Sequence, residues 1–296
     1  MNERVQAGPL IQLPQDVTAA VITMDSRGGY PCRVDNRPLL TIFANGTVRV
    51  IDDSRTKISA EELQDLLRVI EDSGIKFSAE ERQNLLRVDT DEHSDVGPEI
   101  EARVSAEELQ DLLRFAIVEH HFFDFDSVAA QQDLEAEERK TGLRMIAVDS
   151  VKTVIRIRTA ERDHKGEFYD LYHSVTAYPA VKQLVNFYAV EKRLLRLFHE
   201  VRAGGKGSIA TALTLANEYL QRTYPSIPPL VLEDFLYINY TPDGRTMYFV
   251  PTPAVSKQPD YEDGFRKVIF GEAKFSVAVE YVTGGAPKIK VLNPPG

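Results

Sequence analysis

The sequence predicts an α+β protein built from two modules of antiparallel strands that a long helix connects. Two turn signals, Asn45-Gly46 and Pro242-Asp243-Gly244, each separate a pair of short strand-like runs, which is typical of β-hairpins. Between them, residues from about 180 to 203 carry two apolar stripes at helical spacing, so we expect a helix that packs against two layers. We place the N-terminal module at 1–203, with helices mainly on one face of its sheet, and a smaller helix-plus-antiparallel-sheet module at 204–296.

The chain has the composition of a soluble globular protein, with 296 residues of which 43% are hydrophobic and 27% charged. Its net charge of -10 argues against nucleic acid and acidic membranes as partners. The single cysteine, Cys32, has no second cysteine for an internal disulfide, which fits a reducing compartment. No stretch reaches the ~18 apolar residues of a membrane helix, and the first residues lack a signal-peptide pattern. We expect a cytoplasmic protein without a membrane span, although an export signal already removed would leave no trace.

The N-terminal module is expected to be an antiparallel sheet that is covered on one face, because several of its strands alternate apolar and polar side chains. Strand-like runs lie at 19–25, 39–43, 47–51, 143–148, 151–158 and 167–173. Between the third and fourth runs, Ser127 is placed to cap a helix that ends at Gly142.

One eleven-residue sequence occurs three times. Copy one, "ISAEELQDLLR" at 58–68, and copy three, "VSAEELQDLLR" at 104–114, share ten of eleven residues, and copy two, "FSAEERQNLLR" at 77–87, is more divergent. Copies one and three each predict a helix, because a serine and a glutamate form a capping box and leucines follow at the spacing of one buried face. These residues are Ser59, Glu62, Leu63, Leu66 and Leu67 in copy one, and Ser105, Glu108, Leu109, Leu112 and Leu113 in copy three. In copy two, Arg82 replaces the first leucine, which predicts the weakest helix.

The acidity of the chain is concentrated around the first two copies. Residues 57–103 hold 13 acidic and 6 basic side chains, a net charge of -7 out of the total of -10. We interpret 57–103 as an acidic helical insertion, produced by a local duplication, in the connection between a hairpin and a helix. Two interpretations of it stay open: a solvated addition, which loops accept at little cost, or a partner-binding element.

The C-terminal module is predicted from one helix and four strand-like runs. Ser208 is placed to cap a helix that stops at Pro225. The strand-like runs lie at 234–240, 246–250, 274–282 and 287–292.

Several of these stretches resemble a known group of sequences. "AVITMDSRGGY", "LLTIFANGTVRVIDD", "VSAEELQDLLRFAIVEHHFFDFD", "VKTVIRIR" and "AVEKRLLRLFHEVRAGG" resemble uncharacterised bacterial proteins of planctomycete type, over residues 19–203 apart from 57–103. The end of the chain, with "VEYVTGGAPKIKV", faintly resembles PepSY-type or cystatin-like modules, which bind peptides or inhibit proteases. The first resemblance implies structural residues only and carries no known activity.

The densest group of candidate metal ligands is in "EHHFFDFD" at 119–126, where His120, His121, Asp124 and Asp126 supply imidazole and carboxylate groups. Adjacent residues of a helix point about 100° apart, so both histidines rarely reach one ion. The competing interpretation is a helix C-terminus followed by two core phenylalanines. We favour that interpretation and predict no metal ion or other cofactor.

Three further motifs point to chemistry only weakly. The run "DTDEHSD" at 89–95 starts like a calcium loop but lacks the turn glycine and the final glutamate. The run "AGGKGS" at 203–208 departs from the phosphate-binding loop and is explained by a helix end followed by a helix start. Cys32 pairs with His164 or His173 only if the fold brings them together. We therefore predict no catalytic residue.

These observations favour a non-catalytic protein-interaction or structural protein, whose partner is another protein or a second copy of the chain. One alternative is a metal-dependent or other hydrolase that uses the His120/His121 region. A second alternative is a peptide-binding or protease-inhibiting function for residues 204–296.

Overall fold

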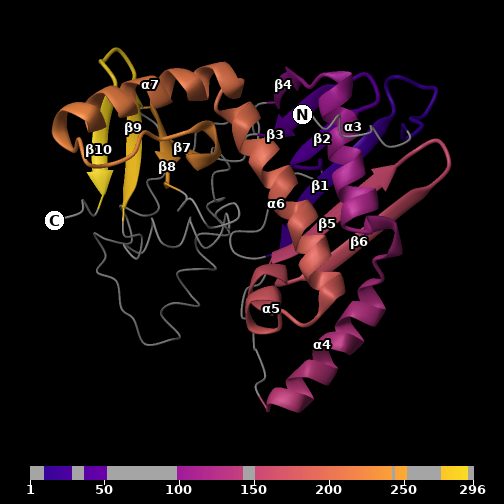
Figure 1. Ribbon diagram of the computed structural model, residues 1–296. Helices are drawn as coiled ribbons and strands as arrows, with labels where there is room; N and C mark the ends of the chain where they lie inside the picture. The colour runs from indigo at the N-terminus through magenta and orange to yellow at the C-terminus, as the bar shows by residue number, and fades with distance from the viewer. Residues whose placement is uncertain are drawn as a thin grey trace, which may run out of the picture.

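Figure 1 shows the chain as a computed structural model, which describes residues 10–28, 37–51, 99–142, 151–241, 244–251 and 275–292. In these ranges the chain forms helices and two antiparallel sheets, here called sheet A and sheet B. The predicted α+β class is therefore confirmed. None of the helices in these ranges is long and apolar enough to cross a membrane.

Sheet A has six antiparallel strands in the order β4-β3-β2-β1-β5-β6. Their bounds are β1 Ala20–Gly28, β2 Leu40–Phe43, β3 Thr47–Ile51, β4 Glu99–Arg103, β5 Val151–Arg158 and β6 Asp163–Tyr169. The strands predicted at 19–25, 39–43, 47–51 and 151–158 are confirmed, and the run at 143–148 lies outside the described residues.

The β2–β3 hairpin depends on Gly46. Its φ of +80° lies in the left-handed region, and a Cβ there would lie 2.5 Å from the Val104 carbonyl oxygen. That close approach allows the Val104 N–H to donate to the Gly46 carbonyl at 2.9 Å. The turn glycine predicted from the sequence therefore also positions the chain that leads into the next helix.

Strand β4 corrects the extent of the acidic helical insertion, which the sequence placed at 57–103. Residues 99–103 instead pair with β3 as an edge strand, with Ile51 opposite Glu99 and Thr47 opposite Arg103. Ile100 and Ala102 pack against the core, whereas the alternate side chains are exposed. The sequence feature that indicates this strand is the alternation of Ile100 and Ala102 with charged residues. Residues 57–98 lie outside the described residues.

Copy three of the repeat forms helix α3, Ala106–Arg114, as predicted. The Glu108 N–H donates to Ser105 Oγ at 3.1 Å, and the Ser105 N–H donates to Glu108 Oε2 at 2.9 Å, so the capping box is present. Leu109, Leu112 and Leu113 are buried. Copies one and two lie outside the described residues.

Helices cover one face of sheet A, as expected. Helix α6, Lys182–Arg202, crosses this face beside α3 (Figure 1). The sheet contributes buried side chains to the shared core: Ile22, Met24, Leu40, Ile42, Val48, Val50, Ile155 and Ile157. The two helices contribute Leu109, Leu112, Leu113, Leu184, Phe187, Leu194 and Phe198.

Two boundaries in the N-terminal half differ from those predicted. Helix α4, Ser127–Thr141, is capped by Asp126 and not by Ser127, because the Asp126 carboxylate accepts from the Val128 and Ala129 N–H groups. The strand predicted at 167–173 ends at Tyr169. Asp170 then adopts a left-handed φ of +51° and turns the chain into helix α5, Leu171–Ala177. The sequence pattern did not predict this turn, because a non-glycine residue rarely adopts a left-handed backbone conformation.

Sheet B has four antiparallel strands in the order β10-β9-β8-β7. Their bounds are β7 Phe235–Thr241, β8 Gly244–Phe249, β9 Ser276–Val282 and β10 Lys288–Leu292. Helix α7, Gly205–Thr223, packs on this sheet through Ile209, Ala212, Leu213, Ala216 and Leu220, and a single 3-10 turn, η4, covers Leu232–Asp234. The helix begins three residues before the predicted cap, Ser208, because Gly204 at φ +89° already turns the chain.

Helix α6 connects the two sheets, as its two apolar stripes predicted. Its last turn carries the buried Arg202, whose guanidinium lies 5.1 Å from the Phe198 ring centre and 5.2 Å from that of Tyr240 on β7. The neighbouring His199 is buried as well, and burial, followed by the charge of Arg202, lowers the pKa of its imidazole well below the ordinary value. The join between α6 and sheet B is thus tightly packed.

Candidate functional site

The four candidate metal ligands do not converge. His120 packs on the Phe115 ring with centroids 4.3 Å apart, and its Nδ1 lies 3.4 Å from Asn186 Oδ1. Asp124 lies 3.7 Å from an Arg162 nitrogen, and Asp126 caps α4. His121 adopts a left-handed φ of +51° at the turn between them. In the ranges that the structure describes, no three His, Cys, Asp or Glu side chains gather as a metal site would require.

The other candidate residues are also apart or cannot be placed. Cys32 and the run at 89–95 lie outside the described residues. His164 Nε2 lies 2.9 Å from the Phe125 carbonyl oxygen, and His173 Nδ1 contacts the Asp170 carboxylate. Both histidines therefore have structural partners of their own.

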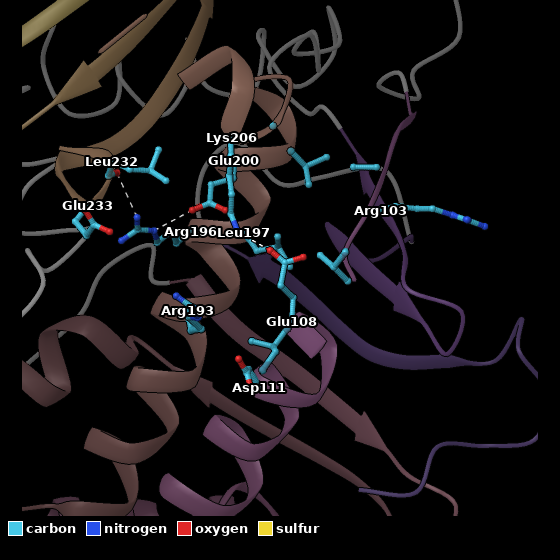
Figure 2. A pocket seen from close by; sticks show the side chains of 15 residues that line it. Arg103, Glu108, Asp111, Arg193, Arg196, Leu197, Glu200, Lys206, Leu232 and Glu233 are labelled. Atoms are coloured by element: carbon cyan, nitrogen blue, oxygen red, sulfur yellow. Dashed lines mark hydrogen bonds and ion pairs between the residues drawn. The ribbon is translucent and has the colours of Figure 1, made fainter. Parts of the chain in front are cut away.

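A cavity of about 440 Å³ lies where the two halves of the chain meet, and we call it the junction groove (Figure 2). It is lined by the end of β4, the first turns of α3, the second half of α6, the start of α7 and the turn η4. Its lining includes Arg103, Glu108, Asp111, Leu112, Arg193, Arg196, Leu197, Glu200, Val201, Lys206, Leu232 and Glu233. Its size is within the range of ligand-binding pockets.

The lining of the groove is apolar at its base and charged around it. Leu112 and Val201 are buried side chains of the sheet A core, and Leu197 packs against that core. Leu232 of η4, which packs against the core of sheet B, lines the groove from the opposite side. The groove therefore exists only because α6 holds α3 and η4 on its two sides.

One ion pair connects the two halves across the groove. Lys206 Nζ, in the first turn of α7, lies 2.5 Å from Glu108 Oε1, in the first turn of α3. The Lys206 ammonium, followed by the Ser105 backbone N–H, lowers the pKa of the Glu108 carboxyl to about 2. Both side chains are largely exposed, so solvent screens this pair.

A second ion pair is less exposed. Arg196 Nε lies 3.0 Å from Glu200 Oε1, one turn further along α6. The same guanidinium donates from Nη2 to the Leu232 carbonyl oxygen at 3.3 Å. Arg196 thus ties α6 to η4, and its charge is matched by Glu200.

Arg193 differs from these residues. It is exposed on α6, one turn before Arg196, and lines the groove beside Asp111 (Figure 2). Within the described part of the chain, its guanidinium has no ion-pair or hydrogen-bond partner. The groove therefore offers five N–H donors and a positive charge that none of the described residues binds.

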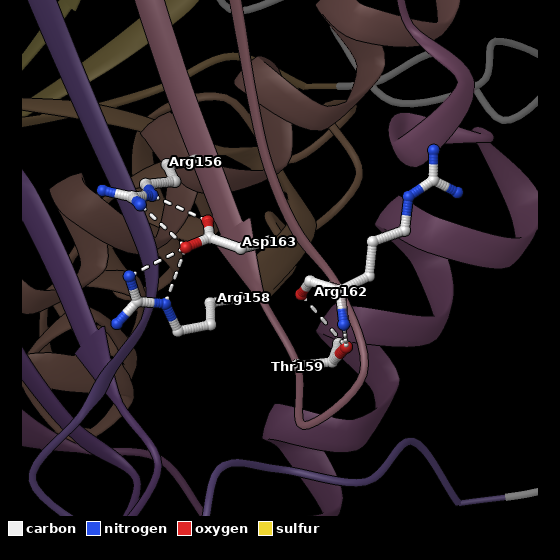
Figure 3. Close-up of polar contacts among 5 residues, drawn as sticks. All are labelled: Arg156, Arg158, Thr159, Arg162 and Asp163. Atoms are coloured by element: carbon white, nitrogen blue, oxygen red, sulfur yellow. Dashed lines mark hydrogen bonds and ion pairs between the residues drawn. The ribbon is translucent and has the colours of Figure 1, made fainter.

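The opposite face of sheet A carries a different polar cluster (Figure 3). Arg156 and Arg158 of β5 both bind Asp163 of β6, at 2.7 Å and 2.8 Å, and Arg156, followed by Arg158, lowers the pKa of that carboxyl. The Thr159 N–H donates to the Arg162 carbonyl at 2.7 Å, which closes the turn. These contacts join β5 to β6 beside their turn and stabilise the hairpin.

No family model, curated protein or solved structure matches the chain. The resemblance to planctomycete-type bacterial proteins and to PepSY-type or cystatin-like modules stays a prediction. Sequence reasoning also missed the groove, because its charged residues come from segments that are distant in the chain: Glu108 and Lys206 are separated by 98 positions.

Proposed function

We propose that this chain is a non-catalytic protein-interaction protein and that the junction groove binds a short stretch of another polypeptide. The stretch would carry apolar side chains for the base of the groove and a carboxylate for Arg193. The observation that carries the proposal is the Arg193 guanidinium, which has no ion-pair or hydrogen-bond partner among the described residues and lines a partly apolar cavity of about 440 Å³.

The charges around the groove favour a peptide of this kind. In the described part of the chain, four cations line the groove. Lys206 and Arg196 are paired with Glu108 and Glu200, and the Arg103 side chain points away from the groove in Figure 2. Arg193 is then the cation available to a carboxylate. A charge-assisted hydrogen bond between a guanidinium and a carboxylate is roughly twice as strong as a neutral one. Asp111 and Glu233 also line the groove and would disfavour a ligand with a large excess of negative charge. We therefore expect one or two carboxylates among apolar residues.

The peptide-binding alternative for residues 204–296 shares this chemistry. The groove, however, needs α3 and α6 in addition to α7 and η4. We therefore assign peptide binding to the junction of the two halves and not to the C-terminal segment alone.

The proposal is tested by selecting ligands from a display library of random short peptides on the full chain. We expect enriched peptides with apolar residues around an aspartate or glutamate, whose affinity falls at least ~10-fold with R193E and weakens with added salt. R139E is the matched control, because Arg139 is an exposed arginine on α4 that does not line the groove. Failure to enrich any peptide, or equal binding by R193E, would refute the proposal.

A further inference from the structure

Helix α3 is held in place by contacts that are specific to its sequence. Its capping box, its three buried leucines and its polar contacts all come from the eleven residues of copy three. Gln110, for example, accepts from the Ile11 N–H at 2.9 Å and donates to the Ile11 carbonyl at 2.9 Å. Glu108 binds Lys206 at 2.5 Å. The surface that receives α3, here called the α3 site, thus recognises a helix with a specific sequence.

Copy one carries every side chain that the α3 site recognises. The cap residues, the glutamine and the leucines recur unchanged, and the one difference is Ile58 in place of Val104, a partly buried aliphatic residue. The corresponding residues of copy one are Ser59, Glu62, Leu63, Gln64, Leu66 and Leu67. Contacts within these eleven residues give the site no means of distinguishing the two copies.

Copy two does not meet the same requirement. Arg82 stands where copy three has Leu109, a side chain that is only 1% exposed. An arginine there would bury a charge among apolar side chains at a large free-energy cost. Copy two is therefore a natural control for copy one.

We propose that copy one, residues 58–68, is a second occupant of the α3 site within the same chain and fills it when copy three leaves. The chain length permits this exchange. The α3 helix begins next to Gly46, five residues before the end of β3 at Ile51, which is roughly 17 Å along a strand. The eight residues from Ile51 to Ser59 span up to about 27 Å.

The flanking residues explain why copy three holds the site at rest. It is preceded by β4, which pairs with β3, and followed by the buried Ala116 and Phe122. Copy one lacks these supports. If the residues before copy one paired with β3 as β4 does, they would be residues 53–57. Only Asp52 would then connect them to Ile51 at the end of β3, and one residue is too short for a hairpin turn. After copy one, Ile70 stands at the position of Ala116, where its larger side chain would be overpacked.

A double-mutant cycle on the full chain tests the exchange, with the midpoint of urea unfolding as the readout. L63R alone should leave the midpoint unchanged, since copy one does not occupy the site at rest. L109R should lower it, and L109R/L63R should lower it by more than the sum of the single changes. The control L109R/L86R, which disables copy two, should match L109R. Additive effects of L109R and L63R would overturn the proposal. So would an L109R/L86R chain whose midpoint is as low as that of L109R/L63R.

Cross-linking gives a direct readout. A carbodiimide joins Lys206 to the carboxylate that it contacts, and trypsin releases copies one and three as separate peptides that differ by one methylene group. We expect Lys206 to be linked to residues 104–114 in the unmodified chain and to residues 58–68 in monomeric L109R. Linkage of L109R to copy three, no linkage, or linkage only between two chains would each overturn exchange within one chain. If L109R does not fold, L109A replaces it, and an L109A/L63R chain no less stable than L109A would overturn the proposal.

Discussion

The two helix–sheet interfaces of the molecule differ in the size of the side chains that the helix contributes. On sheet A, α6 contributes large residues, among them Phe187, whose ring is stacked at 4.2 Å on that of Phe125. On sheet B, α7 contributes Ile209, Leu213 and Leu220 but also two fully buried alanines, Ala212 and Ala216. Because interiors are close-packed, small side chains let a helix backbone approach a sheet and large ones hold it away. The first interface should therefore be sensitive to lost volume and the second to added volume.

The largest effect is expected from emptying the interface on sheet A. F187A should destabilise the chain by about 3–5 kcal/mol, because it leaves a cavity beside Phe122 and Phe125. Urea unfolding measures the change. As a matched aromatic control, Y169A should cost less than about 1 kcal/mol, because Tyr169 is 60% exposed. Equal losses for F187A and Y169A would show that the aromatic stack does not carry this interface.

Overfilling the interface on sheet B should have the next largest effect. A216L should cost about 1–3 kcal/mol, because the added atoms meet a sheet that already touches the helix. A210L is the control, since Ala210 is exposed on the same helix and leucine keeps its helix propensity. Thermal unfolding compares the two variants. If A216L were as stable as A210L, α7 would not lie as close to sheet B as the buried alanines indicate.

The ion pair between the two halves should have the smallest effect and a specific pH dependence. The pKa of Glu108 is lowered from 4.5 to about 2, so its charge stabilises the folded chain above about pH 4.5 and this contribution is lost as the pH falls towards 2. The size is well under about 1 kcal/mol because both partners are exposed. E108Q keeps a residue suited to the capping box and removes the charge.

The measurement is the difference in urea midpoint between the unmodified chain and E108Q at pH 6, at pH 4 and near pH 2. We expect the difference to shrink with falling pH. K206Q should give the same dependence, because it removes the other partner. A difference that does not change with pH would mean that Glu108 acts through its helix cap alone.

Features that depend on residues a few positions apart were predictable from the sequence. The capping box at Ser105 and Glu108 and the turn at Gly46 were predicted correctly, because each involves groups a few residues apart. Strand β4 was missed, because its five residues, a mixture of charged and apolar side chains, have little intrinsic preference for a strand. Pairing with β3 makes them one. The caps predicted at Ser127 and Ser208 were wrong for a related reason: a neighbouring residue, Asp126 or Gly204, already supplied the turn or the hydrogen bonds.

The candidate site was less predictable than the fold. His120, His121, Asp124 and Asp126 attracted attention because they are close in the sequence, but the backbone turn at His121 directs them to different partners. Arg193 gave no signal, since an exposed arginine on an amphipathic helix is ordinary. What distinguishes it is tertiary: the nearby cations Arg196 and Lys206 have carboxylate partners, and Arg193 has none among the described residues.

The sequence by itself determined the class of the fold, the hairpins, the helix of copy three and the double-sided character of α6, because these depend on periodicity and on contacts within a few residues. Only the tertiary structure decided that β4 joins sheet A, that Lys206 contacts Glu108 across the junction, and that Arg193 lines a groove beside them. The physical reason is that contacts between segments distant in the chain depend on how the whole fold packs. Many side chains in the sequence have the right chemistry for such a contact, and only the fold brings particular ones together. Residues 59–68 and 105–114 have the same sequence, so short-range patterns alone predict the same helix for both.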